Sequence, residues 1–141
     1  MSPWHLGVLT MPLRSLNGLR ELFLRRRAEL IKRQDELFSE FTRKITCKYR
    51  KCSIVLFGSR ARGTHVSYSD YDVAVIFEKI SDGFKLIEEL RRLKPRGFSL
   101  DLIVFELKDL EDPLVKKMLS DCVILYDALK VSNILEKKIN K

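Results

Sequence analysis

The chain has 141 residues, of which 45% are apolar and 33% are charged, with only six glycines and four prolines. This composition is typical of a single globular domain, and it excludes disordered, collagen-like and low-complexity proteins. The net charge of +8, from 27 basic and 19 acidic side chains, favours polyanionic partners such as nucleotides, nucleic acid or an acidic protein.

Membrane-spanning and disulfide-stabilised proteins are also not expected. Apolar runs such as Ile54–Phe57 and Val73–Phe77 are far shorter than the ~20 residues that a membrane helix needs. The first residues, MSPWHLGVLTMPLRSL, lack the basic segment that precedes the apolar run of a secretory signal. Cys47, Cys52 and Cys122 are odd in number and lack metal-ligand spacing. We therefore expect reduced thiols, a cytoplasmic location and no membrane contact.

The chain order predicts one domain that follows a short extension. We expect residues 1–13 to be a loose extension and 14–141 one domain, with a helical part (14–50), a central core (51–127) and a closing helix (128–141). Apolar residues at helical spacing predict the first helix: Leu19, Leu22, Phe23, Leu30, Leu37, Phe41 and Ile45. Its basic run RRRAELIKR is expected to be a solvated face, with contact to RNA or a partner as the alternative. A break near Arg25–Arg27 stays open.

Beyond residue 51, short apolar and β-branched runs alternate with helical patterns. They predict strands over Cys52–Phe57, Tyr71–Phe77, Phe98–Phe105 and Cys122–Tyr126. We expect helices over Asp82–Leu93, capped by Ser81, and from Pro113 to about Ser120, with a loop over Arg60–Ser69. The fold class is therefore α+β: a small mixed sheet of about four strands, flanked by helices and preceded by a long helix.

One segment, GSRARGTHVSYSDYD (58–72), contains the most informative pattern. Gly58 and Gly63 have the spacing that opens a Walker A loop, but Thr64 and His65 follow where that motif requires Lys and Ser or Thr. The phosphate-binding lysine is missing, so the Walker A interpretation is rejected.

The Gly58-Ser59 turn nevertheless suits a phosphate. It lies at the carboxyl end of a predicted strand, where α/β sheets tend to present ligand sites. Gly58 lets the backbone approach a ligand closely, and Ser59 offers a hydroxyl and an N–H at the start of a helical turn. Arg60 and Arg62 are candidates to neutralise a triphosphate, because Arg makes bidentate contacts with phosphate oxygens.

Three carboxylates complete the pattern. Asp70 and Asp72 are two residues apart at the start of a strand, so both project onto one face. Asp101 lies in the otherwise apolar run SLDLIVF, and it joins the pair if that strand lies beside Tyr71–Phe77. Adjacent carboxylates repel unless a cation lies between them, and Mg²⁺ prefers oxygen ligands. The three acids therefore indicate a magnesium site, in which Asp101 could hold a second ion. Glu78 and Asp127, at strand exits, are expected to be solvated.

Gly58-Ser59, ten intervening residues and Asp70-Tyr71-Asp72 resemble the GSx10DxD signature of the DNA polymerase β-like nucleotidyltransferase superfamily, and most of all its minimal nucleotidyltransferases. The resemblance covers about residues 50–127. It implies a palm-like fold, two Mg²⁺ ions and transfer of NMP from an NTP, ATP above all, to a hydroxyl acceptor. Asp70 and Asp72 would be paired metal ligands, Asp101 the third ligand and candidate general base, and Gly58 and Ser59 the phosphate cradle. It also implies a HEPN-domain partner, a toxin that such proteins neutralise, some of them by attaching AMP.

Two functions follow from the sequence. The first is a Mg²⁺-dependent nucleotidyltransferase, in a homo- or hetero-oligomer. Its acceptor stays open among a protein tyrosine or serine, which the resemblance places on a partner HEPN toxin, a tRNA end and a small alcohol. The second is a catalytically silent module that neutralises a partner protein, or binds RNA, through the basic helix. The intact set Asp70, Asp72 and Asp101 favours the enzyme, and RNA is the less favoured partner.

Overall fold

The computed structural model describes the backbone of residues 13–63 and 70–135, and side chains from Gly18 onward within these ranges. The first described element is α2 (Leu13–Lys48), a helix of 36 residues and about 54 Å. It is continuous through Arg25–Arg27, so the break left open there does not occur. Leu, Arg, Lys and Glu favour helix, and no proline interrupts this stretch.

A four-stranded mixed sheet forms the centre of the domain, in the order β3-β2-β1-β4. The strands are β1 (Cys52–Phe57), β2 (Tyr71–Phe77), β3 (Leu100–Glu106) and β4 (Val123–Asp127). β1 is antiparallel to both β2 and β4, whereas β2 and β3 are parallel. This arrangement confirms the expected α+β class with a small mixed sheet and a long N-terminal helix.

Short helices lie between the strands and after the last one. They are α3 (Gly58–Arg62), α4 (Gly83–Arg92), the 3-10 helix η1 (Leu107–Glu111), α5 (Pro113–Met118) and α6 (Val131–Leu135). The start of the expected loop over 60–69 is helical, in α3, and residues 64–69 lie outside the described residues. The cap of α4 is Asp82, whose side chain accepts a hydrogen bond from the N–H of Lys85 at 3.2 Å, so the expectation of Ser81 is wrong by one residue.

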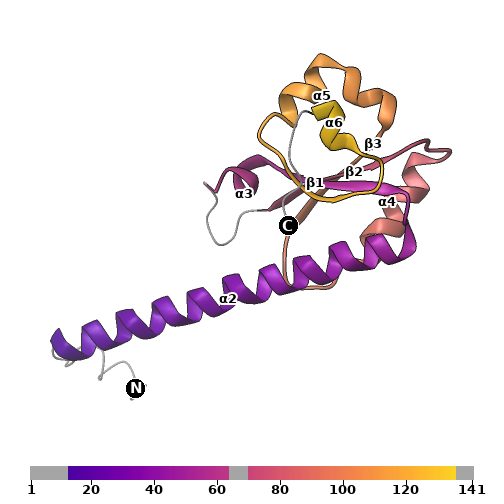
Figure 1. Cartoon of the computed structure of the whole chain (residues 1–141). Coiled ribbons are helices and arrows are strands. Elements are labelled where there is room, and N and C mark those ends of the chain that lie inside the picture. Colours follow the sequence, from indigo (N-terminus) through magenta and orange to yellow (C-terminus); the bar gives the residue numbers. More distant parts are fainter. Residues whose placement is uncertain (1–12, 64–69, 136–141) are drawn as a thin grey trace.

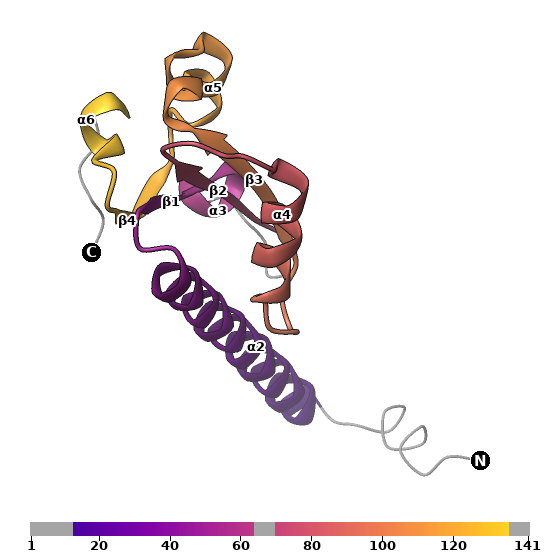
Figure 2. The same cartoon turned by 90° about the vertical axis from the view of Figure 1, so that its right-hand side faces the viewer.

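Helices cover both faces of the sheet (Figures 1 and 2). On one face, Phe41 and Ile45 of α2 and Leu90 of α4 pack against alternate residues of the strands, such as Val73 and Val75. On the other face, a second apolar cluster joins the sheet to η1, α5 and α6; it includes Val55, Ala74, Ile76, Leu110, Leu119 and Val131. The alternation of β2 therefore separates Tyr71 and Val73 from Asp72 and Ala74.

β3 begins at Leu100, two residues later than predicted. Phe98 lies before the strand, buried, and its ring packs edge-on against Phe38 and Tyr71. This aromatic cluster fixes the chain where it enters β3, and it thereby fixes the register of β3 against β2. Among the described helices, none is both long enough and apolar enough to cross a membrane.

Candidate active site

The register of β2 and β3 places two of the predicted acids side by side. Asp72 pairs with Asp101 across these parallel strands, and residues directly opposite in a sheet project to the same face. Asp70 lies immediately before β2. Asp70 and Asp101 are exposed, and Asp72 is half-buried. The three acids that the sequence singled out therefore lie at one edge of the sheet.

The charges of the neighbouring acids affect the pKa of Asp72. Burial raises the pKa of Asp72, and the charges of Asp101 and then Asp70 raise it further. Arg62 acts in the opposite direction and lowers the pKa. Arg62 is exposed at the end of α3, so it is the cation of this segment that faces the acids.

Gly58 determines how closely the backbone approaches Asp72. It follows Phe57, which pairs with Asp72 across the antiparallel strands β1 and β2. Its φ of +76° lies in the left-handed region, which residues with a Cβ rarely adopt. A Cβ at this position would overlap Oδ2 of Asp72. Glycine is therefore required here both for the turn and for the space that the carboxylate occupies. Ser59 follows, half-buried in the first turn of α3.

Arg60 lies on the other face of the sheet from Asp72, and its contact with a triphosphate stays a prediction. Its side chain is only 3% exposed, and its guanidinium stacks on the ring of Tyr71, 3.7 Å from the centroid. The same group donates to Gln34 Oε1 at 3.2 Å and lies 3.9 Å from Asp35 Oδ1. Tyr71 projects to the α2 face of the sheet, opposite Asp72. Arg60 thus fixes α3 to α2 and β2.

The donor chemistry at this edge fits a divalent cation. Carboxylate oxygens are the ligands that Mg²⁺ prefers, and the pKa of Asp72 is raised by its acidic neighbours, as repulsion between negative charges requires. Within the described residues, no three Asp, Glu, His or Cys side chains are close enough together to form a complete metal site. A bound cation would reduce the repulsion between these neighbouring carboxylates. His65 lies outside the described residues.

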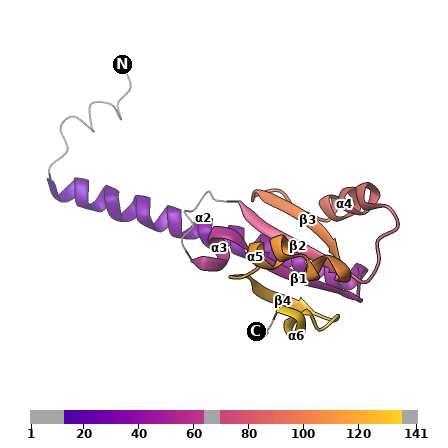
Figure 3. The same ribbon diagram turned by 90° about the horizontal axis from the view of Figure 1, so that it is seen from above.

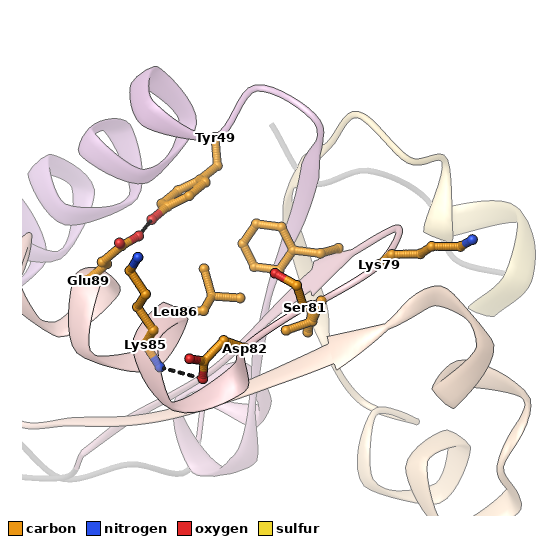
Figure 4. Close-up of a pocket in the computed structure, with 9 residues that line it drawn as sticks. Tyr49, Lys79, Ser81, Asp82, Lys85, Leu86 and Glu89 are labelled. Atoms are coloured by element: carbon orange, nitrogen blue, oxygen red, sulfur yellow. Dashed lines mark hydrogen bonds between the residues drawn. The ribbon is translucent and has the colours of Figure 1, made fainter.

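A separate pocket lies at the opposite end of β2 (Figure 4). It is bordered by Tyr49, Phe77 and the start of α4. Across it the Tyr49 hydroxyl donates to Glu89 Oε2 at 2.6 Å, which joins α2 to α4. Burial, followed by this acidic neighbour, raises the pKa of Tyr49 to about 12. Phe77 is the last residue of β2 and Asp72 is the second, so this pocket does not include the acids.

Asp127 is a half-buried carboxylate whose role the sequence did not reveal. We expected it to be solvated, but its Oδ1 accepts from the Ser53 hydroxyl at 2.8 Å and from the N–H of Val131 at 2.7 Å. Its Oδ2 accepts from the N–H of Ser132 at 3.1 Å. It therefore caps α6, and an Asp four residues before a short helix is the signal that could have indicated this. Glu78 is exposed, as expected.

The fold is a small mixed sheet with three acids at one edge, beside a glycine turn. The model of the nucleotidyltransferase domain family matches residues 39–126. This chain belongs to that family, and it is a nucleotidyltransferase.

Two relatives come from Methanocaldococcus jannaschii. The chain is 33% identical to "Putative protein adenylyltransferase MJ1305" over 105 residues, which is 66% of this chain and 71% of that protein. It is 38% identical to "Putative protein adenylyltransferase MJ1379" over 82 residues, 55% of this chain and 78% of that protein.

Two solved structures share the fold. A structure described as a putative nucleotidyltransferase from Sulfolobus solfataricus matches with a TM-score of 0.55 and 22% identity, covering 73% of this chain and 89% of that one. A toxin–antitoxin structure with AMP-PNP matches with a TM-score of 0.50 and 19% identity, covering 69% and 78%.

Proposed function

We propose that this nucleotidyltransferase transfers AMP from ATP, with Mg²⁺, to a hydroxyl group of a partner protein. The observation that supports the proposal most is the placement of Asp70, Asp72 and Asp101 at one sheet edge, where Asp72 lies against the glycine turn at Gly58. A structural role does not account for three acids that repel one another.

The reaction forms one phosphorus–oxygen bond and breaks another. The acceptor oxygen attacks the α-phosphorus of ATP, the bond from that phosphorus to the bridging oxygen breaks, and pyrophosphate leaves. Asp70, Asp72 and Asp101 would hold one or two Mg²⁺ ions, which when bound neutralise negative charge on the reacting phosphates. Asp101, the more exposed of the paired acids, is the candidate to take the proton of the acceptor hydroxyl.

The neighbouring turn would position the triphosphate. Gly58 leaves room for phosphate oxygens close to the backbone, and Ser59 adds a hydroxyl and an N–H. Arg62 would contribute the positive charge, since Arg60 is held between α2 and β2. Positioning and electrostatics would supply most of the rate enhancement, as is general for phosphoryl-type transfer.

The proposed acceptor is a tyrosine or serine of a partner, for which a HEPN-domain toxin is the leading candidate. Both curated relatives are named as protein adenylyltransferases, and one structure with the same fold is a toxin–antitoxin. These names favour a protein acceptor over a tRNA end or a small alcohol, and a toxin–antitoxin pair as the setting.

The test is to incubate the protein and Mg²⁺ with α-labelled or γ-labelled ATP in a lysate of its own host. We expect the α-label, and not the γ-label, to become attached to a protein band. The doubly substituted Asp70→Asn/Asp72→Asn protein is the control, and it should transfer no label. Transfer that survives both substitutions would contradict the assignment of the acids. Label that enters only RNA or small molecules would contradict the protein acceptor.

A further inference from the structure

The amino-terminal half of α2 extends beyond the domain, and no element within residues 13–63 and 70–135 covers it (Figures 1 and 3). We name residues 18–33 the α2 arm. Every residue from Gly18 to Leu30 is exposed, whereas Leu37, Phe41 and Ile45 farther along the same helix are buried. The family model begins only at residue 39. The arm is therefore an addition to the catalytic domain, and the domain's own core does not use it.

The arm presents an apolar stripe that a helix in water does not need. Leu19, Leu22, Phe23 and Leu30 lie at helical spacing on one side, and their exposed fractions are 43, 47, 66 and 64%. Their spacing places them on the face that becomes buried in the second half of α2. Exposed apolar side chains gathered on one face mark a protein contact, and anchors at i, i+3, i+4 and i+11 suit a helical partner.

The positive charge of the arm indicates which charge the partner surface carries. Residues 18–33 contain six basic side chains and two acidic ones. Arg26 lies one turn beyond Phe23 and one turn before Leu30, so it interrupts the stripe, with Arg27 at its border. A matching surface must be apolar at its ends and acidic at its centre and margins. The arm thus fits a helical surface in which Asp and Glu border an apolar seam.

A second copy of this chain is a poor occupant. An antiparallel pair that matched Phe23 with Leu30 of the other copy would have its midpoint at residues 26 and 27. Arg26 of each copy would then lie opposite Arg27 of the other copy. Repulsion between these like charges disfavours the pair.

The arm ends where α2 contacts α3. Its last turn adjoins Gln34 and Asp35, which contact Arg60 of α3, and α3 begins at the Gly58 turn beside Asp72. From there the arm extends past the edge of the sheet at which α3 lies (Figure 1). A protein bound along the arm would therefore extend from the side of the domain that carries α3 and the Gly58 turn.

We propose that the α2 arm is a docking surface for an acidic helical protein, and that it brings this protein to the acid edge as the acceptor. The identification of the bound protein as acceptor rests on the proposed function; the docking surface itself does not.

The test uses a synthetic 21-residue helical peptide with Leu at positions a and d of each heptad and Glu at e and g. A second peptide of the same pattern has Lys at e and g. Fluorescence anisotropy with the full-length protein should show binding of the Glu peptide only. Phe23→Ser/Leu30→Ser and Arg26→Glu/Arg27→Glu should each weaken it about tenfold or more. The charge-reversed variant should bind the Lys peptide instead. Leu114→Ser, at an apolar residue of α5 that is 78% exposed, is the matched control and should bind as the wild type does.

Three outcomes would overturn the proposal. In the first, the protein binds both peptides equally or binds neither. In the second, the wild type is a dimer that becomes monomeric in Phe23→Ser/Leu30→Ser. In the third, the protein binds single-stranded RNA or anionic vesicles tightly but does not bind the Glu peptide. Thermal stabilisation by ATP and Mg²⁺ is measured on every variant. If it persists while peptide binding fails, the docking surface is wrong and the enzyme assignment stands. If it is absent throughout while the peptide binds, the reverse holds.

Discussion

Two half-buried carboxylates lie beside opposite ends of β1 and behave in opposite ways. Asp127 pairs with Ser53 near the start of the strand, and hydrogen bonds from Ser53, Ser132 and Val131 outweigh the effect of burial and lower its pKa. Asp72 pairs with Phe57 at the end of the strand, where burial, Asp101 and Asp70 raise its pKa. The first carboxylate has donors and stabilises the fold. The second faces other acids, and the fold tolerates it at a cost.

The largest difference between the two carboxylates should appear in catalysis. Asp72→Asn should reduce nucleotidyl transfer at least about 100-fold, because a charged group that acts on the reacting phosphates is lost. Asp127→Asn, the same chemical change at the other end of β1, should leave transfer per folded molecule within about twofold. The measurement is label transfer from α-labelled ATP below the unfolding temperature of both variants. An equal loss of nucleotidyl transfer in Asp72→Asn and Asp127→Asn would contradict the different roles assigned to the two carboxylates.

The contact between Gly58 and Asp72 gives the next largest effect. Gly58→Ala should destabilise the protein by about 2 kcal/mol or more, because a Cβ there meets the Asp72 carboxylate and the backbone is left-handed. Gly63→Ala, at φ +75° with no atom within 4 Å, should cost only about 1 kcal/mol.

Gly83→Ala completes this series. Gly83 begins α4 and has neither a positive φ nor a neighbour within 4 Å, so it should be neutral or slightly stabilising. Urea unfolding of the three variants separates the effect of the carboxylate from that of the turn. A Gly58→Ala protein as stable as Gly63→Ala would show that Asp72 does not need this space.

Asp127→Asn should lower the free energy of unfolding by about 1–2 kcal/mol, since an amide nitrogen replaces an oxygen that accepts an N–H. The folded pKa of Asp127 is lowered below 3.8. Its contribution is therefore fully present above pH 3.8 and is lost as the pH falls through the folded pKa. Unfolding curves from pH 7 to pH 3 measure this dependence. A penalty that stays constant at low pH would contradict it.

Asp72→Asn should have the smallest effect on stability and the opposite sign, with an increase in melting temperature of about 1–3 °C in EDTA. Because the pKa of Asp72 is raised above 3.8 in the folded protein, the charged form is disfavoured there. The gain should be complete above the folded pKa and vanish below pH 3.8. Differential scanning fluorimetry at several pH values tests it. A decrease in melting temperature at pH 7 would contradict the repulsion.

Local patterns were sufficient to predict most of the fold. The predicted bounds of β1 and β2 are the observed ones. A strand that is buried on both faces needs a nearly continuous apolar sequence, and such a run is easy to recognise. The spacing of Asp70 and Asp72 and the isolated charge of Asp101 identified the acids, whose catalytic role stays a prediction.

The features that the sequence did not reveal depend on contacts between distant residues. Arg60 resembles any basic side chain of a phosphate loop, and only the packing of Tyr71 against α2 shows that it is held there. Asp127 depends on Ser53, which is 74 residues away. The apolar stripe of α2 predicted the helix, but only its packing against the sheet shows that the second half alone is buried.

The most direct test of the central claim is a calorimetric titration of ATP into the full-length protein. With Mg²⁺ the wild type should release or absorb heat with a measurable dissociation constant, EDTA should abolish the signal, and Asp72→Asn should weaken binding about tenfold or more while Asp127→Asn does not. A wild-type protein that gives no heat with ATP and Mg²⁺, or an Asp72→Asn protein that binds as the wild type does, would contradict the claim that these acids form the nucleotide site.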